Sequence, residues 1–277
     1  MIPEVTIAKL IADYSVILLD AYGILVDMLG ALPGAQNLIE KLNRMKKPYF
    51  ILTNDASKLP ETSARLFRKF GLDIAPERII TSGTLLKDYF KSHHLIDARC
   101  VVLGPNDSVR YVEAAGGHLV SELEAFDVLV LADETGFPFL ESVDAVLTAL
   151  FHRLDLRETV HLILPNPDLI YPKANKGFGI TSGCVALMFE AALRLRYPHR
   201  NQLSFTRLGK PHAAIFKEAL RRSGTRDMVM IGDQLETDIR GANAFGIDSV
   251  LVDRGACPIS TTDLPDPVRP AYRLAAL

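Results

Sequence analysis

The chain has 277 residues, a formal net charge of −2, 48% hydrophobic residues and 23% charged residues. This length suffices for one large domain or two smaller ones, and the composition is that of a globular protein. The small net charge excludes the basic excess typical of nucleic-acid-binding proteins. No apolar stretch approaches the roughly 18 residues that span a bilayer, so we expect no membrane partner.

The N-terminal and cysteine patterns bear on the expected compartment. Met1–Glu4 lacks the basic start and apolar core of a signal peptide. The three cysteines, Cys100, Cys184 and Cys257, show no spacing typical of disulfides or metal sites. We therefore expect a cytoplasmic protein.

Apolar runs alternate with amphipathic segments near both ends of the chain. This alternation predicts a parallel sheet with helices on both faces, which is an α/β fold. The expected strands are 16–20, 48–53, 79–81, 227–231 and 249–252, and the expected helices are 33–44, 60–70 and 236–245.

The middle of the chain has an α/β alternation of its own. Strands are expected at 100–104, 128–132 and 161–165, with helices from about 108 and over 140–153. Because this stretch separates two halves of one expected sheet, it predicts an inserted domain. We expect the inserted domain at 84–180 and a core domain made of 1–83 and 181–277.

The first expected strand ends at an aspartate. Four apolar residues, 16–19, run directly into Asp20, and ligands of open α/β sheets bind at the carboxyl ends of the strands. A carboxylate at that place can act as a nucleophile or a metal ligand. A turn-initiating aspartate before Gly23 explains the same pattern.

Other strand ends supply further groups that phosphoryl transfer needs. Thr53 ends the second strand, Asp233 and Asp238 follow the strand at 227–231, and Lys210 precedes a helix. Such a reaction needs a nucleophile, donors to the phosphate oxygens, a lysine and acidic ligands for Mg²⁺. Each residue also has a structural interpretation: strand punctuation, a helix cap, or a solvated surface charge.

Four segments resemble, in order, the motifs of the haloacid dehalogenase superfamily of phosphohydrolases. They are Asp20-Ala21-Tyr22-Gly23-Ile24-Leu25, Ile51-Leu52-Thr53-Asn54, Gly209-Lys210-Pro211 and Gly232-Asp233-Gln234-Leu235-Glu236-Thr237-Asp238-Ile239. With Leu32-Pro33-Gly34-Ala35 and Asn166-Pro167-Asp168, the chain is similar to subfamily IIA, which includes NagD-like and 4-nitrophenylphosphatase or pyridoxal phosphatase-like enzymes. The resemblance implies a Rossmann-like core with a parallel sheet and an inserted α/β cap domain of the C2 type.

The resemblance also implies a mechanism. Asp20 would attack a small phosphate monoester, such as a sugar phosphate, and form an aspartyl-phosphate that water then hydrolyses. Thr53, Asn54 and Lys210 would bind the phosphate, with Lys210 also taking part in catalysis. Mg²⁺ would be held by Asp20, the backbone carbonyl of Tyr22, Asp233 and Asp238.

Tyr22 departs from the family pattern. Family phosphatases carry an aspartate at this position, which protonates the leaving group and later activates water. Tyrosine, with an unperturbed pKa near 10, is a poor base at neutral pH, and losing general acid–base catalysis slows a reaction by roughly 10²–10⁴-fold. A phosphatase with slow turnover is therefore expected.

Two alternatives to a phosphatase remain open. One is a protein that binds a phosphorylated metabolite with little turnover. The other is a 2-haloacid dehalogenase, because Asp20-Ala21-Tyr22-Gly23 resembles the first motif of that family, although the presence of Asp233 argues against it.

The oligomeric state is open as well. Many subfamily relatives dimerise through the cap, and the apolar helix Leu140–Phe151 could form a homodimer. Burial of this helix inside the cap explains its pattern equally well.

Overall fold

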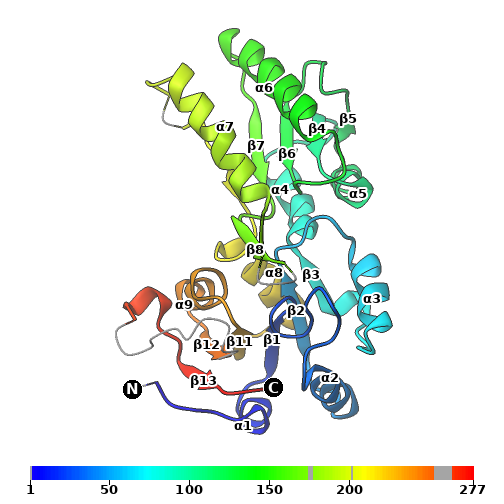
Figure 1. Cartoon of the computed structure of the whole chain (residues 1–277), viewed down its shortest axis with the longest axis vertical. Helices are drawn as coiled ribbons and strands as arrows, with labels where there is room; N and C mark the ends of the chain where they lie inside the picture. The colour runs from blue at the N-terminus through cyan, green and yellow to red at the C-terminus, as the bar shows by residue number, and fades with distance from the viewer. Residues whose placement is uncertain (1, 174–176, 201, 253–263) are drawn as a thin grey trace. The chain divides into compact units, whose positions relative to one another are not determined.

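The computed structural model describes residues 2–173, 177–200, 202–252 and 264–277 (Figure 1), so Cys257 lies outside the described residues. The chain divides into two compact units. The first unit comprises Met1–Thr53, Pro60–Thr81 and Lys210–Leu277, and the second comprises Asn54–Leu59 and Ser82–Gly209.

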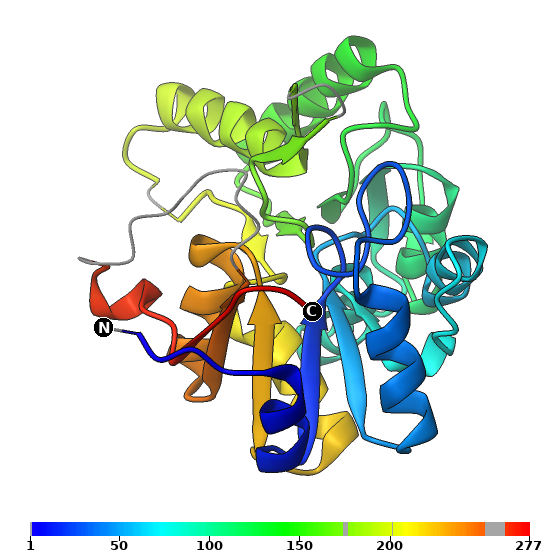
Figure 2. The ribbon, with the colours of Figure 1, turned by 60° about the horizontal axis from the view of Figure 1, so that its bottom comes forward.

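The first unit is built on a six-stranded sheet in the order β13-β12-β11-β1-β2-β3, and every neighbouring pair is parallel. The strands are β1 (Val16–Asp20), β2 (Tyr49–Thr53), β3 (Ile79–Thr81), β11 (Met228–Gly232), β12 (Asp248–Val252) and β13 (Tyr272–Leu274). Figure 2 shows helices on both sides of this sheet, as predicted. They are α1 (Ile7–Asp13), α2 (Ala35–Arg44), α3 (Pro60–Lys69), α8 (Ala213–Ser223) and α9 (Arg240–Phe245).

The apolar runs of the sequence form the core of this unit. All five residues of β1 are buried, and so are all five of β11. Alternate side chains of the strands join one cluster with the inner faces of α1, α2 and α3. A strand whose two faces are both covered by helices must be apolar along its length. This requirement makes Asp20, at the end of β1, a conspicuous exception.

The second unit has its own parallel sheet of five strands in the order β10-β7-β6-β4-β5. The strands are β4 (Arg99–Leu103), β5 (His118–Leu119), β6 (Val128–Leu131), β7 (His161–Leu164) and β10 (Thr206–Arg207). Its helices are α4 (Leu86–Ser92), α5 (Asn106–Ala114), α6 (Phe139–Asp155) and α7 (Ser182–Arg196), and an antiparallel hairpin pairs β8 (Ile170–Pro172) with β9 (Phe178–Ile180).

The second unit extends further along the chain than the expected inserted domain of 84–180. Helix α7 and strand β10 were expected in the core domain, but β10 pairs with β7, and α7 buries Val185, Phe189 and Leu193 in the second unit's core. The short segment Asn54–Leu59 also belongs to this unit. Amphipathic periodicity indicates that a helix buries one face, but it does not identify the sheet against which that face packs.

Helix α6 contains the apolar segment that we considered for dimerisation. Its buried residues, Val143, Val146, Leu150 and Leu154, lie in the hydrophobic core of the second unit. Internal packing accounts for these residues, whereas Leu140 is 64% exposed, and dimerisation through this helix stays a prediction. Among the described residues, no helix is both long enough and apolar enough to cross a membrane.

An ion-pair network joins α6 to the start of two strands in the second unit. Asp127 accepts hydrogen bonds from Arg99 Nε at 3.0 Å and Nη2 at 2.8 Å, and from Arg153 Nη2 at 2.9 Å. The hydrogen bond from Arg99 is the largest cause that lowers the pKa of Asp127 below its usual value. A carboxyl group with a lowered pKa stabilises the fold above its unfolded-state pKa, and this contribution is lost as the pH falls through the folded-state pKa.

We predict that Asp127→Asn lowers the free energy of unfolding by about 1 kcal/mol at neutral pH, because Asp127 is partly exposed and its ion pairs are screened by solvent. The loss should shrink below about pH 4, where the unfolded carboxyl is also protonated. Urea unfolding at several pH values measures this difference. Asp144→Asn, an exposed acid on α6, is the control. A loss that stays constant down to about pH 3 would contradict the role of the Asp127 charge.

Candidate active site

The order of the strands brings the predicted site residues to one edge of the first sheet. β1 lies between β11 and β2, with Leu19 opposite Ile231 and Asp20 opposite Leu52. Asp20 therefore ends β1 next to the ends of β2 and β11. Asp233 comes directly after β11, and Asp238 lies in the π-helix Leu235–Ile239 that follows. The structure thus brings these three residues to the same edge of the sheet.

Asp20, Asp233 and Asp238 form a compact carboxylate cluster. One oxygen from each lies within 4.8 Å of the others. The Nζ atom of Lys210 lies 2.6 Å from Asp20 Oδ1 and 2.7 Å from Asp238 Oδ1. Asp238 and Lys210 are buried, so neither is the solvated surface charge of the structural interpretation.

Lys210 remains charged in this environment. Burial by itself lowers the pKa of a lysine, but the adjacent carboxylates of Asp20 and Asp238 outweigh burial and raise the pKa of Lys210 above its usual value. An ammonium group that is 3% exposed is tolerated only when it is paired and hydrogen-bonded. The two ion pairs meet that condition.

Burial acts on the pKa of Asp20 in the opposite direction to its effect on Lys210. Burial raises the pKa of its carboxyl well above the usual range, Lys210 lowers it, and Asp238 and Asp233 raise it further. With all groups ionised, three carboxylates and one ammonium leave two negative charges in a largely buried space. Such a site is electrostatically incomplete without a cation.

The donor set fits Mg²⁺. Mg²⁺ prefers hard oxygen ligands and is commonly held by one or two carboxylates together with water and phosphate oxygens. The three clustered carboxylates supply oxygen donors of this kind. Two of them lie against glycines: a Cβ at Gly23 would collide with the carboxylate of Asp233, and a Cβ at Gly232 would collide with that of Asp238. The backbone thus leaves space that these carboxylates fill.

Thr53 and Asn54, which were both expected to bind phosphate, lie on the two sides of a boundary between the units. Thr53 ends β2 in the first unit and is buried. Asn54 belongs to the second unit, where its Nδ2 donates a hydrogen bond of 2.8 Å to Asp168 Oδ1. The sequence analysis used Asn166-Pro167-Asp168 as part of the subfamily resemblance and did not anticipate this partner. No local pattern marks a pair separated by more than a hundred residues.

Tyr22 lies in the turn that follows β1. Gly23 in this turn has a φ of +90°, and its N–H donates to the carbonyl of Val26 at 2.9 Å. The ring of Tyr22 is partly buried and packs against the core of the first unit. The residue that replaces the family's aspartate therefore contributes to packing.

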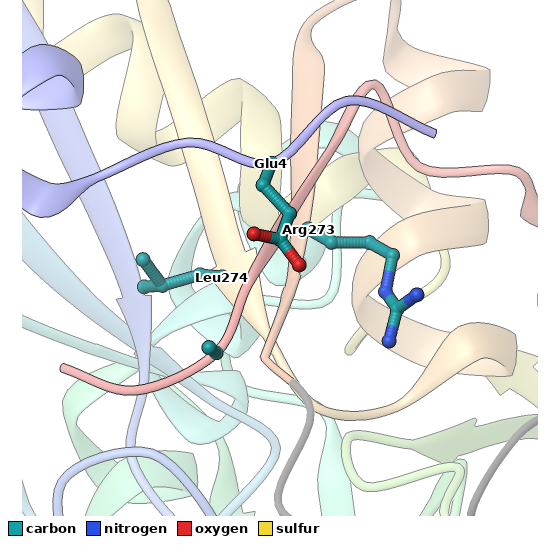
Figure 3. A pocket seen from close by; sticks show the side chains of 4 residues that line it. Glu4, Arg273 and Leu274 are labelled. Carbon is teal, nitrogen blue, oxygen red and sulfur yellow. The ribbon is translucent and has the colours of Figure 1, made fainter. Parts of the chain in front are cut away.

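A small hollow of about 200 Å³ lies beside β13, lined by Glu4, Arg273, Leu274 and Ala275 (Figure 3). The N–H of Arg273 donates to the carbonyl of Pro3, and its carbonyl accepts from Val5. The hollow thus lies where the N-terminal segment pairs with β13. None of its lining residues belongs to the carboxylate cluster.

We predict that Gly23→Ala weakens Mg²⁺ binding by at least about tenfold, or about 1.4 kcal/mol, because the new methyl group displaces the Asp233 carboxylate. Isothermal titration calorimetry measures the affinity. Gly224→Ala is the matched control: its φ of +72° is also positive, but no atom lies within 4 Å of the new methyl. Equal Mg²⁺ affinity in the two variants would show that Asp233 is not a ligand.

Comparisons with known proteins bear on the family and the fold of the chain. A family model described as haloacid dehalogenase-like hydrolase matches residues 17–118, and a second, described as HAD-hydrolase-like, matches 207–277. The dihydroxyacetone phosphatase of Corynebacterium glutamicum is 28% identical over 240 residues, which cover 86% of this chain and 80% of that protein. The acid sugar phosphatase of Staphylococcus haemolyticus is 25% identical over 245 residues, covering 88% and 86%.

A solved structure shares the whole fold. It is described as a possible sugar phosphatase of the HAD superfamily from Cytophaga hutchinsonii, and it is 29% identical, with a TM-score of 0.83 and coverage of 100% of this chain and 98% of that one. The predicted fold class, a Rossmann-like core with a parallel sheet and an inserted α/β domain, is confirmed. The chain belongs to the haloacid dehalogenase-like hydrolase family.

Proposed function

We propose that this chain is a Mg²⁺-dependent phosphatase that hydrolyses a small phosphate monoester through an aspartyl-phosphate on Asp20. The observation that carries the proposal is the buried cluster at the end of β1, in which Lys210 bridges Asp20 and Asp238 and Asp233 completes a three-carboxylate group. A nucleophilic carboxylate, a fixed cation and acidic metal ligands are the groups that transfer of a phosphoryl group requires.

The relatives support a sugar phosphate as the substrate class. The C. glutamicum and S. haemolyticus proteins are named as a dihydroxyacetone phosphatase and an acid sugar phosphatase, and each covers more than four fifths of this chain. We propose that the substrate is a small phosphorylated sugar or triose.

The residues of the first unit would carry the first step. An oxygen of Asp20 forms a bond to phosphorus while the ester P–O bond breaks and the leaving alkoxide takes a proton. Thr53 and Lys210 would hold the phosphoryl oxygens, since both are buried at or beside this edge of the sheet. To contact the phosphate, the Lys210 ammonium would exchange part of its contact with Asp20 for a contact with a phosphate oxygen. Its positive charge would then neutralise negative charge on the phosphate.

The second step would release Asp20. A water molecule attacks phosphorus, the bond to the Asp20 oxygen breaks, and inorganic phosphate leaves. The Mg²⁺ ion would be held by Asp20, the Tyr22 carbonyl, Asp233 and Asp238, and when bound it neutralises negative charge on the phosphate oxygens. Asp238 is held in place by the N–H of Gln234, which donates to its Oδ2 at 3.2 Å.

Tyr22 would make both steps slow. A carboxyl group at this position could protonate the leaving oxygen and later accept a proton from water, whereas a phenol exchanges protons poorly at neutral pH. The first step relies on protonation by solvent or substrate. The second has no carboxylate base at position 22, which favours accumulation of the phosphorylated protein.

We predict Mg²⁺-dependent phosphate release from a panel of monoesters containing dihydroxyacetone phosphate, glycerol phosphate, glucose 6-phosphate and 4-nitrophenyl phosphate. Asp20→Asn should reduce the rate by at least about 10³-fold, since an amide cannot replace the nucleophile. Asp144→Asn serves as the control. Tight binding of these esters without release would support the binding-protein alternative, and release of halide from a 2-haloacid without metal would support the dehalogenase.

We predict that Tyr22→Asp raises kcat by about 10²-fold, within the range that general acid–base catalysis contributes. Tyr22→Phe keeps the packed ring and removes only the hydroxyl, so its kcat should equal that of the wild type. Steady-state kinetics at saturating Mg²⁺ measure both variants, with thermal unfolding as a check on the lost packing. If Tyr22→Asp folds, keeps its Mg²⁺ affinity and is no faster, our account of Tyr22 is wrong.

A further inference from the structure

The chain passes between the two units at four peptide bonds. These are the bonds after Thr53, Leu59, Thr81 and Gly209. Two of the four junctions adjoin proposed phosphate-binding residues, because Thr53 and Lys210 are the first-unit residues at the first and the last. The backbone of each of these residues is thus attached directly to the second unit.

At three of these junctions the second-unit residue is Asn54, Ser82 or Gly209, and the latter two both lie against Asn54. The hydroxyl of Ser82 donates a hydrogen bond of 2.6 Å to the backbone carbonyl of Asn54. A Cβ built on Gly209 would lie 2.5 Å from Asn54 Oδ1 and 2.7 Å from the carbonyl oxygen of Pro165, so the Gly209 backbone rests against both. The junctions after Thr53, Thr81 and Gly209 are therefore gathered within one cluster.

Asn54 is fixed within this cluster by its side chain. Its Nδ2 donates to Asp168 Oδ1 at 2.8 Å, and the residue is only 4% exposed. The N–H of Gly209 donates to the Pro165 carbonyl at 2.9 Å, three residues before Asp168. The segment 165–168 thus holds Asn54 through its side chain and Gly209 through its backbone.

The residues that follow Asn54 are also tied to the second unit. The carbonyl of Ala56 accepts from the Ser108 hydroxyl at 2.8 Å, the N–H of Leu59 donates to Asp107 Oδ2 at 3.1 Å, and the carbonyl of Lys58 accepts from the Tyr111 hydroxyl at 2.6 Å. These partners lie on α5. Asn54 therefore begins a short segment that is hydrogen-bonded to α5, and this segment is not a free linker.

We propose that Asn54 is a positioning residue, which acts through the backbones of Thr53 and Lys210 and does not itself contact the phosphate. The hydrogen bond to Asp168 orients the Asn54 carboxamide against Gly209, and the two junctions then place Thr53 and Lys210. The inference rests on the proposed function, because these two residues matter only if they bind the phosphoryl group. It replaces the expectation that Asn54 binds phosphate directly.

Exchanging the side chains of the hydrogen-bonded pair Asn54 and Asp168 tests this role. Asn54→Asp sets two carboxylates against each other, so kcat/KM should fall by at least about tenfold, as misplacement of catalytic groups does. Asp168→Asn still offers an amide oxygen to Asn54 and should stay within about threefold of the wild type. The double variant Asn54→Asp/Asp168→Asn reverses donor and acceptor, and it should recover to within about threefold of the wild type.

The pattern of kinetic constants separates positioning from direct contact. Misplaced Thr53 and Lys210 should lower kcat more than they raise KM, because they grip the transferring group in the transition state. A carboxylate at position 54 that faced the phosphate would repel it in both the single and the double variant. A double variant as slow as Asn54→Asp, or an Asp168→Asn variant equally slow, would therefore overturn the proposal.

Hydrogen–deuterium exchange tests the inference independently of activity. Peptides covering 52–56 and 207–212 should exchange faster in Asn54→Asp than in the wild type, and the double variant should restore protection. Unchanged exchange in Asn54→Asp would overturn the positioning role. Restored protection in a protein that releases no phosphate would instead contradict the proposed function and leave the positioning role supported.

Discussion

The site depends on one buried ammonium group placed between two buried carboxylates. Lys210 contacts Asp20 and Asp238 at 2.6 and 2.7 Å, and all three residues are nearly inaccessible to solvent. Each charge alone would be strongly destabilising at such a depth. Their mutual pairing makes the burial tolerable, but Asp233 adds a further negative charge that Lys210 does not neutralise. An excess of negative charge among hard oxygen donors is the physical basis of our proposal that a divalent cation binds at this place.

The parallel sheet explains why these residues meet. Asp20, Thr53 and Asp233 each stand at the end of a strand, and the neighbouring order β11-β1-β2 places the three ends side by side. Asp238 lies in a π-helix, a rare helix type that is frequently found at functional sites. Glycines at positions 23 and 232 then allow the carboxylates to approach the backbone closely.

Much of this site could be predicted from the sequence, because its signals are local. A run of apolar residues ending in Asp20 marks a buried strand and the edge where it emerges, and the same holds for Asp233. Asp20, Asp238 and Lys210 each lie in a local motif of the sequence, and the strand order then brings the three motifs together. Tyr22 was also visible as a departure from the family pattern, although its packing against the core was not.

The contacts that were missed are those that link distant segments. Asn54 and Asp168 lie more than a hundred residues apart, and neither has a neighbouring pattern that indicates the other. The sequence analysis placed residues 182–196 in the core domain, whereas α7 packs in the second unit. The reason is the same, since the helix has an apolar face that could pack on either sheet. Gly209 illustrates this limit well: the sequence shows a glycine before Lys210, while its closeness to Asn54 and Pro165 is a property of the folded second unit.

Tyr22 makes the central claim directly measurable. If Asp20 is the nucleophile and no base stands at position 22, the phosphorylated protein should persist long enough to be trapped. Acid quenching during turnover with Mg²⁺, followed by mass spectrometry of the peptide that contains Asp20, tests this. We predict a phosphoryl group on Asp20 that is absent when Mg²⁺ is removed by a chelator. Steady release of phosphate without phosphorylation of Asp20, or phosphorylation of another residue, would contradict the account.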